Sequence, residues 1–207
     1  MTRPVALCVF CSSSERIEAS YVALAGQVGR ELAARGWTLV TGGGSVSMMG
    51  AVARAARAGG ARTVGVIPHA LVAMEVADHD ADELVVTGDM RERKGVMDAR
   101  ADAFLALPGG IGTLEELLEV WVAGTLGMHG KPVVVLDPDG LFDPLRRQVE
   151  VLVEQGFVRE GASDRLRWAT SVTEALDVVA RDLELPTPGA TATSPTERAE
   201  EYLEAQP

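Results

Sequence analysis

Residues that cross-link chains or coordinate metals are scarce in this sequence. Its 207 residues include two cysteines and three histidines. Cys8 and Cys11 lie in an apolar run typical of a strand, whereas a redox C-x-x-C pair lies at the start of a helix. The histidines show no metal-ligand spacing, and Glu83 stands where a calcium loop beginning at Asp78 would require glycine. We therefore expect buried structural thiols and no metal site.

Lysine is equally scarce, since Lys94 and Lys131 are the only lysines, and with 19 Lys and Arg against 30 Asp and Glu the formal net charge is −11. An acidic protein repels phosphate backbones, so nucleic acid is not an expected partner. No run of roughly 18 uncharged apolar residues occurs, and a membrane-spanning helix is therefore not expected. Residues 1–4 lead into an apolar segment without an A-x-A cleavage site, so we expect an unprocessed, cytoplasmic chain.

Apolar runs, by contrast, are abundant and alternate with segments of helical periodicity. Hydrophobic residues make up 47% of the chain, which favours a folded domain. The alternation predicts right-handed βαβ crossovers and a Rossmann-like, doubly wound parallel sheet in a single α/β domain, residues 1–185. We expect strands at residues 5–10, 37–41, 63–67, 84–87, 103–107 and 133–136, and helices at 19–35, 48–58, 89–101, 113–126, 142–155 and 172–182.

Three of the predicted strands end in unusual loops, at residues 11–14, 41–50 and 108–116. In an open parallel sheet, ligands bind beyond the carboxyl ends of the strands. Glycines in the second and third of these loops allow the backbone to approach a ligand, and the N–H groups of the next helix attract anions. The P-loop sequence is absent, and Ser47 replaces the third glycine of the dinucleotide fingerprint. These loops therefore predict a phosphate-bearing ligand other than NAD.

The predicted helix at residues 89–101 carries two cations on an otherwise apolar face. Met90, Arg93, Lys94 and Met97 are spaced i, i+3, i+4 and i+7, so they share one side of the helix. Either both cations extend to solvent from the edge of the core, or they face an anionic ligand. In a chain this acidic, the second interpretation is favoured.

Two interpretations are open for the glutamates that follow the third loop. Thr113 and Glu116 have the spacing of a capping box, which would stabilise a helix start without any further role. A glutamate beside a phosphate-binding loop is also within reach of a ligand's sugar. Glu115 and Glu116 point about 100° apart, so at most one of them faces a given site.

Several motifs together resemble those of the LOG ("lonely guy") family of phosphoribohydrolases. The sequence P-G-G-I-G-T-L-E-E at residues 108–116 is similar to the family's P-G-G-x-G-T-x-x-E, and M-R-E-R-K at 90–94 is similar to M-x-x-R-K. Residues 41–50 resemble the family's second glycine loop, and the similarity extends over about residues 5–179.

The resemblance implies a Rossmann-like fold and a homodimer or larger homo-oligomer. The implied activity is hydrolysis of the N-glycosidic bond of an N6-modified adenosine 5′-monophosphate, which activates a cytokinin and needs no cofactor or metal. Arg93 and Glu116 then have catalytic roles. The implied contacts to the substrate and its phosphate are Ser13, Gly43, Gly44, Lys94, Gly109, Gly110, Gly112, Thr113 and Glu115.

Three positions depart from the family pattern. Ser12 and Ser47 stand where many relatives have glycine, and Met74 stands where many have arginine. A non-catalytic nucleotide or cofactor carrier on the same fold is therefore the alternative function. Arg93 and Glu116 favour the enzyme, and Met74 favours the carrier. The preferred N6 substituent, and the choice between hormone activation and nucleotide salvage, stay open.

Residues 186–207 are predicted to form a flexible C-terminal tail, because residues 186–195 are rich in proline and threonine and poor in large apolar side chains. Deleting this tail should leave the melting temperature and activity almost unchanged. Thermal unfolding of the truncated and full chains checks this, and a clear fall in melting temperature on truncation would show that the tail docks on the domain.

Overall fold

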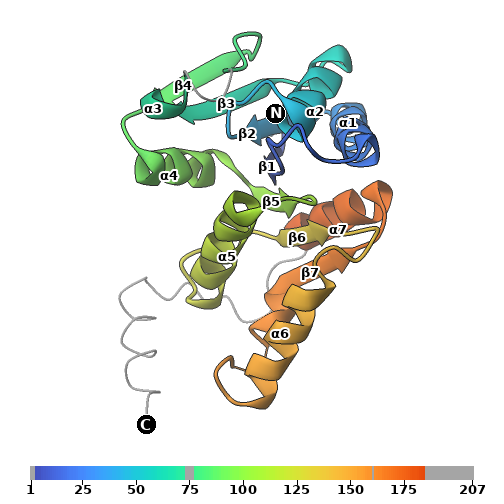
Figure 1. Ribbon diagram of the computed structural model, residues 1–207, viewed down its shortest axis with the longest axis vertical. Coiled ribbons are helices and arrows are strands. Elements are labelled where there is room, and N and C mark those ends of the chain that lie inside the picture. The colour runs from blue at the N-terminus through green and yellow to red at the C-terminus, as the bar shows by residue number, and fades with distance from the viewer. Residues whose placement is uncertain (1–2, 73–76, 160, 185–207) are drawn as a thin grey trace.

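The computed structural model describes residues 3–72, 77–159 and 161–184. Its centre is a seven-stranded sheet in the order β4-β3-β2-β1-β5-β6-β7, in which every neighbouring pair is parallel (Figure 1). This confirms the predicted Rossmann-like α/β fold. The strands are β1 (Ala6–Phe10), β2 (Thr38–Thr41), β3 (Thr63–Pro68), β4 (Glu83–Thr87), β5 (Ala103–Ala106), β6 (Val133–Leu136) and β7 (Leu166–Ala169).

The helices agree with the predicted ones to within a few residues. The start of α4 was predicted at Asp89, and the Asp89 carboxylate does cap it by accepting the N–H groups of Arg91 and Glu92 at 2.8 and 2.9 Å. The described helices are α1 (Ala19–Ala34), α2 (Ser47–Ala58), α3 (His69–Val72), α4 (Met90–Arg100), α5 (Ile111–Thr125), α6 (Asp143–Glu154), the 3₁₀ turn η1 (Ser163–Arg165) and α7 (Val172–Glu184).

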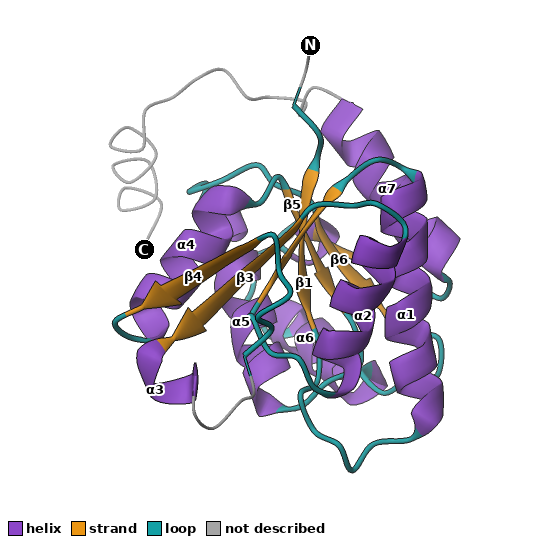
Figure 2. Ribbon diagram, turned by 90° about the horizontal axis from the view of Figure 1, so that it is seen from above, coloured by secondary structure: helices purple, strands orange, loops and turns teal. Residues whose placement is uncertain are grey.

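Helices cover both faces of the sheet, because alternate residues of each strand point to opposite sides. Leu7 and Val9 pack with α1, α2 and α7, whereas Cys8 and Phe10 pack with α4, α5 and α6. Figure 2 shows α1 and α2 on one side of the strands and α4 on the other. Burial on both faces explains why the strands are almost entirely apolar.

The two cysteines lie in opposite halves of this core. Cys8 packs with the α4 and α5 side, and Cys11 packs with the α1 and α2 side. Both are free thiols, and burial raises the pKa of each well above its ordinary value. They are structural, as predicted, and their positions on opposite faces prevent them from pairing.

The order of the strands reverses between β1 and β5. The chain adds β2, β3 and β4 on one side of β1, and β5, β6 and β7 on the other. At such a reversal the loops after the two central strands diverge, one toward each face of the sheet, and leave a crevice at the carboxyl edge. The three unusual loops follow β1, β2 and β5, so they surround this point, and the two glycine loops predicted to bind phosphate are those after β2 and β5.

Besides the 3₁₀ turn η1, two described elements were not predicted from the sequence. One is β7, an edge strand whose apolar run is interrupted by the exposed Arg167. The other is the single turn α3, which is too short to show a helical period. Met74 and the predicted tail lie outside the described residues. Within the described ranges, no helix has the length and apolar character needed to cross a membrane.

Helix α5 leaves a strip of apolar side chains uncovered. Leu118 is 37% exposed and Val122 50% exposed, and beyond the helix Met128 is 72% exposed and Phe157 81% exposed. No charged residue occurs between Val120 and Met128, so the second half of this helix offers apolar side chains on nearly every side.

We therefore expect the protein to form a dimer or larger oligomer that buries this strip. Light scattering at micromolar concentration measures the mass in solution. A monomer mass would contradict the prediction.

Candidate functional site

The second loop brings the backbone close to strand β3. Gly43 has φ +77°, and a Cβ atom there would approach the backbone nitrogen of Val66 to 3.1 Å. Gly43 N–H bonds to the Thr41 hydroxyl at 3.2 Å, and Gly44 N–H bonds to the Met49 sulfur at 3.0 Å. The predicted substrate contacts Gly43 and Gly44 are thus buried in a tight turn at the carboxyl end of β2.

The first and second loops are joined through Ser47, one of the departures from the family pattern. Ser47 has φ +50°, a conformation that favours glycine. Its hydroxyl donates to the backbone oxygen of Ser14 at 2.6 Å, a bond that helps to hold this conformation and that glycine could not form. Ser12 accepts the N–H of Ser14 at 3.1 Å, and Ser13 lies half-buried between them.

The third loop runs directly into α5, and here the predicted capping box is wrong. The helix begins at Ile111 with Gly110 as its N-cap, so Thr113 is already inside the first turn, and no side chain caps the helix. Gly109 is required, because a Cβ atom there would lie 2.1 Å from the Thr113 hydroxyl oxygen. Around Gly110 and Gly112 the space is open. An uncapped helix start of this kind attracts an anion.

Arg93 lies at the centre of the site with only 6% of its side chain exposed. Its Nε–H donates to the backbone oxygen of Val66 at 3.0 Å, and its Nη2 donates to the backbone oxygen of Gly42 at 3.0 Å. A Cβ atom on Gly42 would come within 1.9 Å of Nη2, so glycine is needed for this contact. Helix α4 therefore directs a buried guanidinium toward the end of β2, which the sequence analysis did not anticipate.

Glu116 faces this guanidinium from α5. Its Oε1 lies 3.6 Å from Arg93 Nη1, and 12% of its side chain is exposed. Glu115 points elsewhere and is half-exposed, as the angle between the two residues predicts. The structure thus brings together Arg93 and Glu116, the two predicted catalytic residues, from different helices.

Lys94 joins the same two helices outside this pair. Its ammonium forms ion pairs with Glu115 and Glu119, which are one helical turn apart on α5. Hydrogen bonds to these two carboxylates raise the pKa of Lys94 above its ordinary value. Two acidic partners therefore balance the charge that was predicted to contact the substrate.

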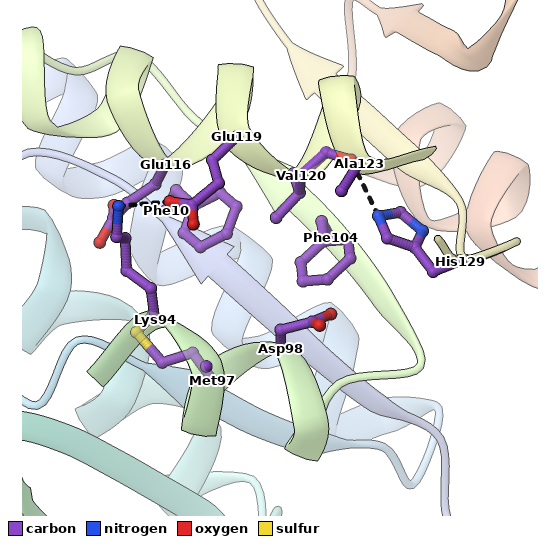
Figure 3. A pocket seen from close by; sticks show the side chains of 11 residues that line it. Phe10, Lys94, Met97, Asp98, Phe104, Glu116, Glu119, Val120, Ala123 and His129 are labelled. Atoms are coloured by element: carbon purple, nitrogen blue, oxygen red, sulfur yellow. Dashed lines mark hydrogen bonds and ion pairs between the residues drawn. The ribbon is translucent and has the colours of Figure 1, made fainter. Parts of the chain in front are cut away.

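A crevice of about 110 Å³ extends from Glu116 between α4 and α5. Its floor is formed by Phe10 and Phe104, whose rings stack 5.8 Å apart, and its far end by His129 (Figure 3). Met97 on α4 and Val120 on α5 add apolar walls, and the charged side chains of Lys94, Asp98 and Glu119 also line the crevice. Across the described residues, no group of three or more His, Cys, Asp or Glu side chains is placed to hold a metal ion.

A parallel sheet with glycine loops and an uncapped helix at its switch point defines a Rossmann-like protein that binds an anionic ligand at its carboxyl edge. A family model described as "Possible lysine decarboxylase" matches residues 49–179. The cytokinin riboside 5′-monophosphate phosphoribohydrolase of Mycobacterium marinum is 56% identical over 172 residues, which are 83% of this chain and 91% of that protein. The enzyme of the same name from Mycobacterium tuberculosis is 54% identical over 81% of this chain and 89% of its own length. The chain belongs to this family, the LOG phosphoribohydrolases.

Solved structures with the same fold include a protein of different described role. The molybdenum cofactor carrier protein of Chlamydomonas reinhardtii superimposes with a TM-score of 0.68 at 23% identity, covering 88% of this chain and all of that one. At this identity the likeness shows the shared fold alone.

The environment of the lysines does not suit the decarboxylase description. A lysine that forms a Schiff base needs a lowered pKa, which burial or a neighbouring cation provides. Lys94 has the opposite environment, between two carboxylates that raise its pKa. Lys131, the other lysine, bonds to the backbone oxygen of Asp98 at 2.6 Å and to its carboxylate at 2.7 Å.

His129, at the far end of the crevice, is held in its neutral form. Its Nε2 lies 2.8 Å from the backbone oxygen of Val120, and its Nδ1 accepts the N–H of Lys131 at 3.2 Å. Burial is the main cause that lowers its pKa below the ordinary 6.5, and the charges of Lys131 and Arg165 act in the same direction. Asp98 and the Val120 bond oppose them.

This arrangement predicts a loss of stability in acid. Below pH 6.5 the unfolded chain binds a proton at His129 that the folded protein resists, so the free energy of unfolding falls as the pH falls toward the lowered pKa. Gln can make both neutral hydrogen bonds, so His129→Gln should lose less stability between pH 7 and 5. Denaturant unfolding of both proteins across this pH range measures the difference. If the free energy of unfolding falls equally in the two proteins, His129 is not the group that causes the loss.

Proposed function

We propose that this protein hydrolyses the N-glycosidic bond of N6-modified adenosine 5′-monophosphate, giving the free base, an active cytokinin, and ribose 5-phosphate. The observation that carries the proposal is the buried guanidinium of Arg93, directed at Glu116 beside the uncapped start of α5. The names of relatives at 54–56% identity support the same reaction.

The phosphate is assigned to the start of α5. Its first-turn N–H groups, at Ile111, Gly112 and Thr113, have no side-chain cap. Glu116 follows five residues after Ile111, about 7.5 Å further along the helix axis. One helix therefore offers groups for both ends of the sugar phosphate.

Glu116 and Arg93 are assigned complementary roles at the bond that breaks. As the bond from the anomeric carbon to the purine nitrogen lengthens, positive charge develops on the ribose, and the Glu116 carboxylate stabilises it. Glu116 also orients a water molecule and accepts its proton while the water oxygen bonds to the anomeric carbon. The bonding electron pair leaves with the base, where Arg93 stabilises the negative charge until that nitrogen takes a proton from solvent, and Glu116 returns to solvent the proton that it took from the water.

The base would leave beside the apolar crevice that Glu116 borders. We also propose that residues 1–185 form the catalytic domain, and that the enzyme acts in the cytoplasm as a homo-oligomer that buries the exposed strip on α5. No cofactor takes part in the proposed reaction.

The alternative is a non-catalytic carrier with the same fold. Incubating the pure protein with adenosine 5′-monophosphate and with isopentenyladenosine 5′-monophosphate, and assaying free base, separates the two functions. A carrier would bind a nucleotide or cofactor without releasing base.

Glu116→Gln tests the central role of this carboxylate. The variant should fold normally, because Glu116 is not part of a helix cap and Arg93 retains its two carbonyl acceptors. It removes the charge that stabilises the transition state, and such groups contribute on the order of 10²–10⁴-fold in rate. We expect kcat to fall by at least about a hundredfold while nucleotide binding persists.

Glu115→Gln is the matched control. It also removes one carboxylate charge, but the carboxylate of Glu115 pairs with Lys94 and not with Arg93. It should lose far less activity. Wild-type turnover by Glu116→Gln would show that the glutamate has no catalytic role.

A further inference from the structure

The connection from β3 to β4 is built differently from the other crossovers. Among its described residues only His69–Val72 are helical, whereas the neighbouring crossovers contain α1, α2, α4, α5 and α6 (Figure 1). Residues 77–82 return to the start of β4 as irregular chain. Because irregular chain lacks the internal hydrogen bonds of a helix, its position depends on contacts to its neighbours.

One of these contacts is a buried ion pair. The Asp78 carboxylate accepts two hydrogen bonds from the guanidinium of Arg57 on α2, at 2.7 and 3.0 Å. The Asp78 side chain is 7% exposed and that of Arg57 19% exposed. This two-pronged contact fixes the direction as well as the distance between the partners. It therefore ties the irregular segment to helix α2.

The same aspartate is bonded through its backbone to the glycine loop of the site. Asp78 N–H donates to the carbonyl oxygen of Gly43 at 2.8 Å, and Ala77 forms an antiparallel bridge with Gly44. The neighbouring carbonyl, that of Gly42, accepts the hydrogen bond from Arg93. Gly42 and Gly43 have no side chains to anchor them, so hydrogen bonds to their backbone determine where the Gly42 carbonyl points.

We propose that Asp78, held by Arg57, is a positioning residue that sets the orientation of the Arg93 guanidinium through the backbone of Gly43, whose carbonyl it binds, and of Gly42, whose carbonyl Arg93 binds. The role rests on the proposed hydrolysis, since Arg93 is the group that would contact the departing base. Asp78 itself contacts no substrate in this arrangement. A small displacement of a reacting group lowers the rate strongly, even when binding is retained.

Asp78→Asn tests the role, because it keeps the size of the side chain and the backbone N–H but loses the charged two-pronged contact. With isopentenyladenosine 5′-monophosphate as substrate, we expect kcat to fall about tenfold or more while KM changes little. Asp177→Asn is the control, since it breaks a 2.7 Å ion pair with Arg35 between α7 and α1, away from the site. The control should retain wild-type kcat, and an Asp78→Asn variant as active as the control would overturn the proposal.

A double-mutant cycle separates positioning from a general loss of stability. If Asp78 acts through Arg93, then Asp78→Asn should cost much less in an Arg93→Lys background than in the wild type. An equal fold-loss in both backgrounds would show that Asp78 acts independently of Arg93, and would also overturn the proposal.

Arg57→Lys keeps the experiment informative if Asp78→Asn does not fold. Lysine retains the charge but not the planar fork, so kcat should fall measurably below that of the wild type. Unchanged kcat in Arg57→Lys would count against the role. Absence of free base from the wild-type protein would instead refute the proposed hydrolysis, and this role with it.

Discussion

A buried guanidinium stabilises a protein only when its N–H groups find acceptors, since an unpaired charge in the interior is very costly. The site of this protein is arranged around one such group. Arg93 donates to the carbonyls of Val66 and Gly42 and lies opposite the Glu116 carboxylate. These partners come from β3, the loop after β2 and α5, so several elements must reach their final positions before the charge is satisfied.

Close packing around this site, rather than a need for flexible loops, explains why several loop positions are glycine. Gly42 lies so close to Arg93 that a side chain would occupy the position of the guanidinium, and Gly43 packs against the backbone of β3. Gly109 leaves room for Thr113 in the same way. At these positions a side chain would displace the groups that pack against the loop backbone.

Acidic residues also outnumber basic ones where α4 and α5 meet at this site. Arg93 and Lys94 are adjacent on α4, and α5 presents Glu115, Glu116 and Glu119 to them. Because they pair with different glutamates, the two cations have different roles. Lys94 links the two helices at the surface, and Arg93 is left buried beside the catalytic carboxylate of the proposed reaction.

Much of this could be read from the sequence, because it depends on local patterns. The alternation of apolar and helical segments predicted the parallel sheet, and the helix expected to begin at Asp89 begins one residue later, at Met90. The spacing of Arg93 from Met97 predicted that both lie on one side of α4, and both are buried there. Glu115 and Glu116 were expected to diverge, and they do.

Other features were decided only by the tertiary structure. The Thr113 capping box had the right spacing, but α5 begins earlier, at a glycine N-cap that leaves its first turn open. Strand β7 forms because β6 offers it an edge, although its own sequence is interrupted by Arg167. The partners of Arg93 are backbone carbonyls 27 and 51 residues away in the chain, and Asp78 contacts both Arg57 and Gly43. Such contacts leave no periodic signal, because a carbonyl group is present at every residue and only the fold determines which one an arginine meets.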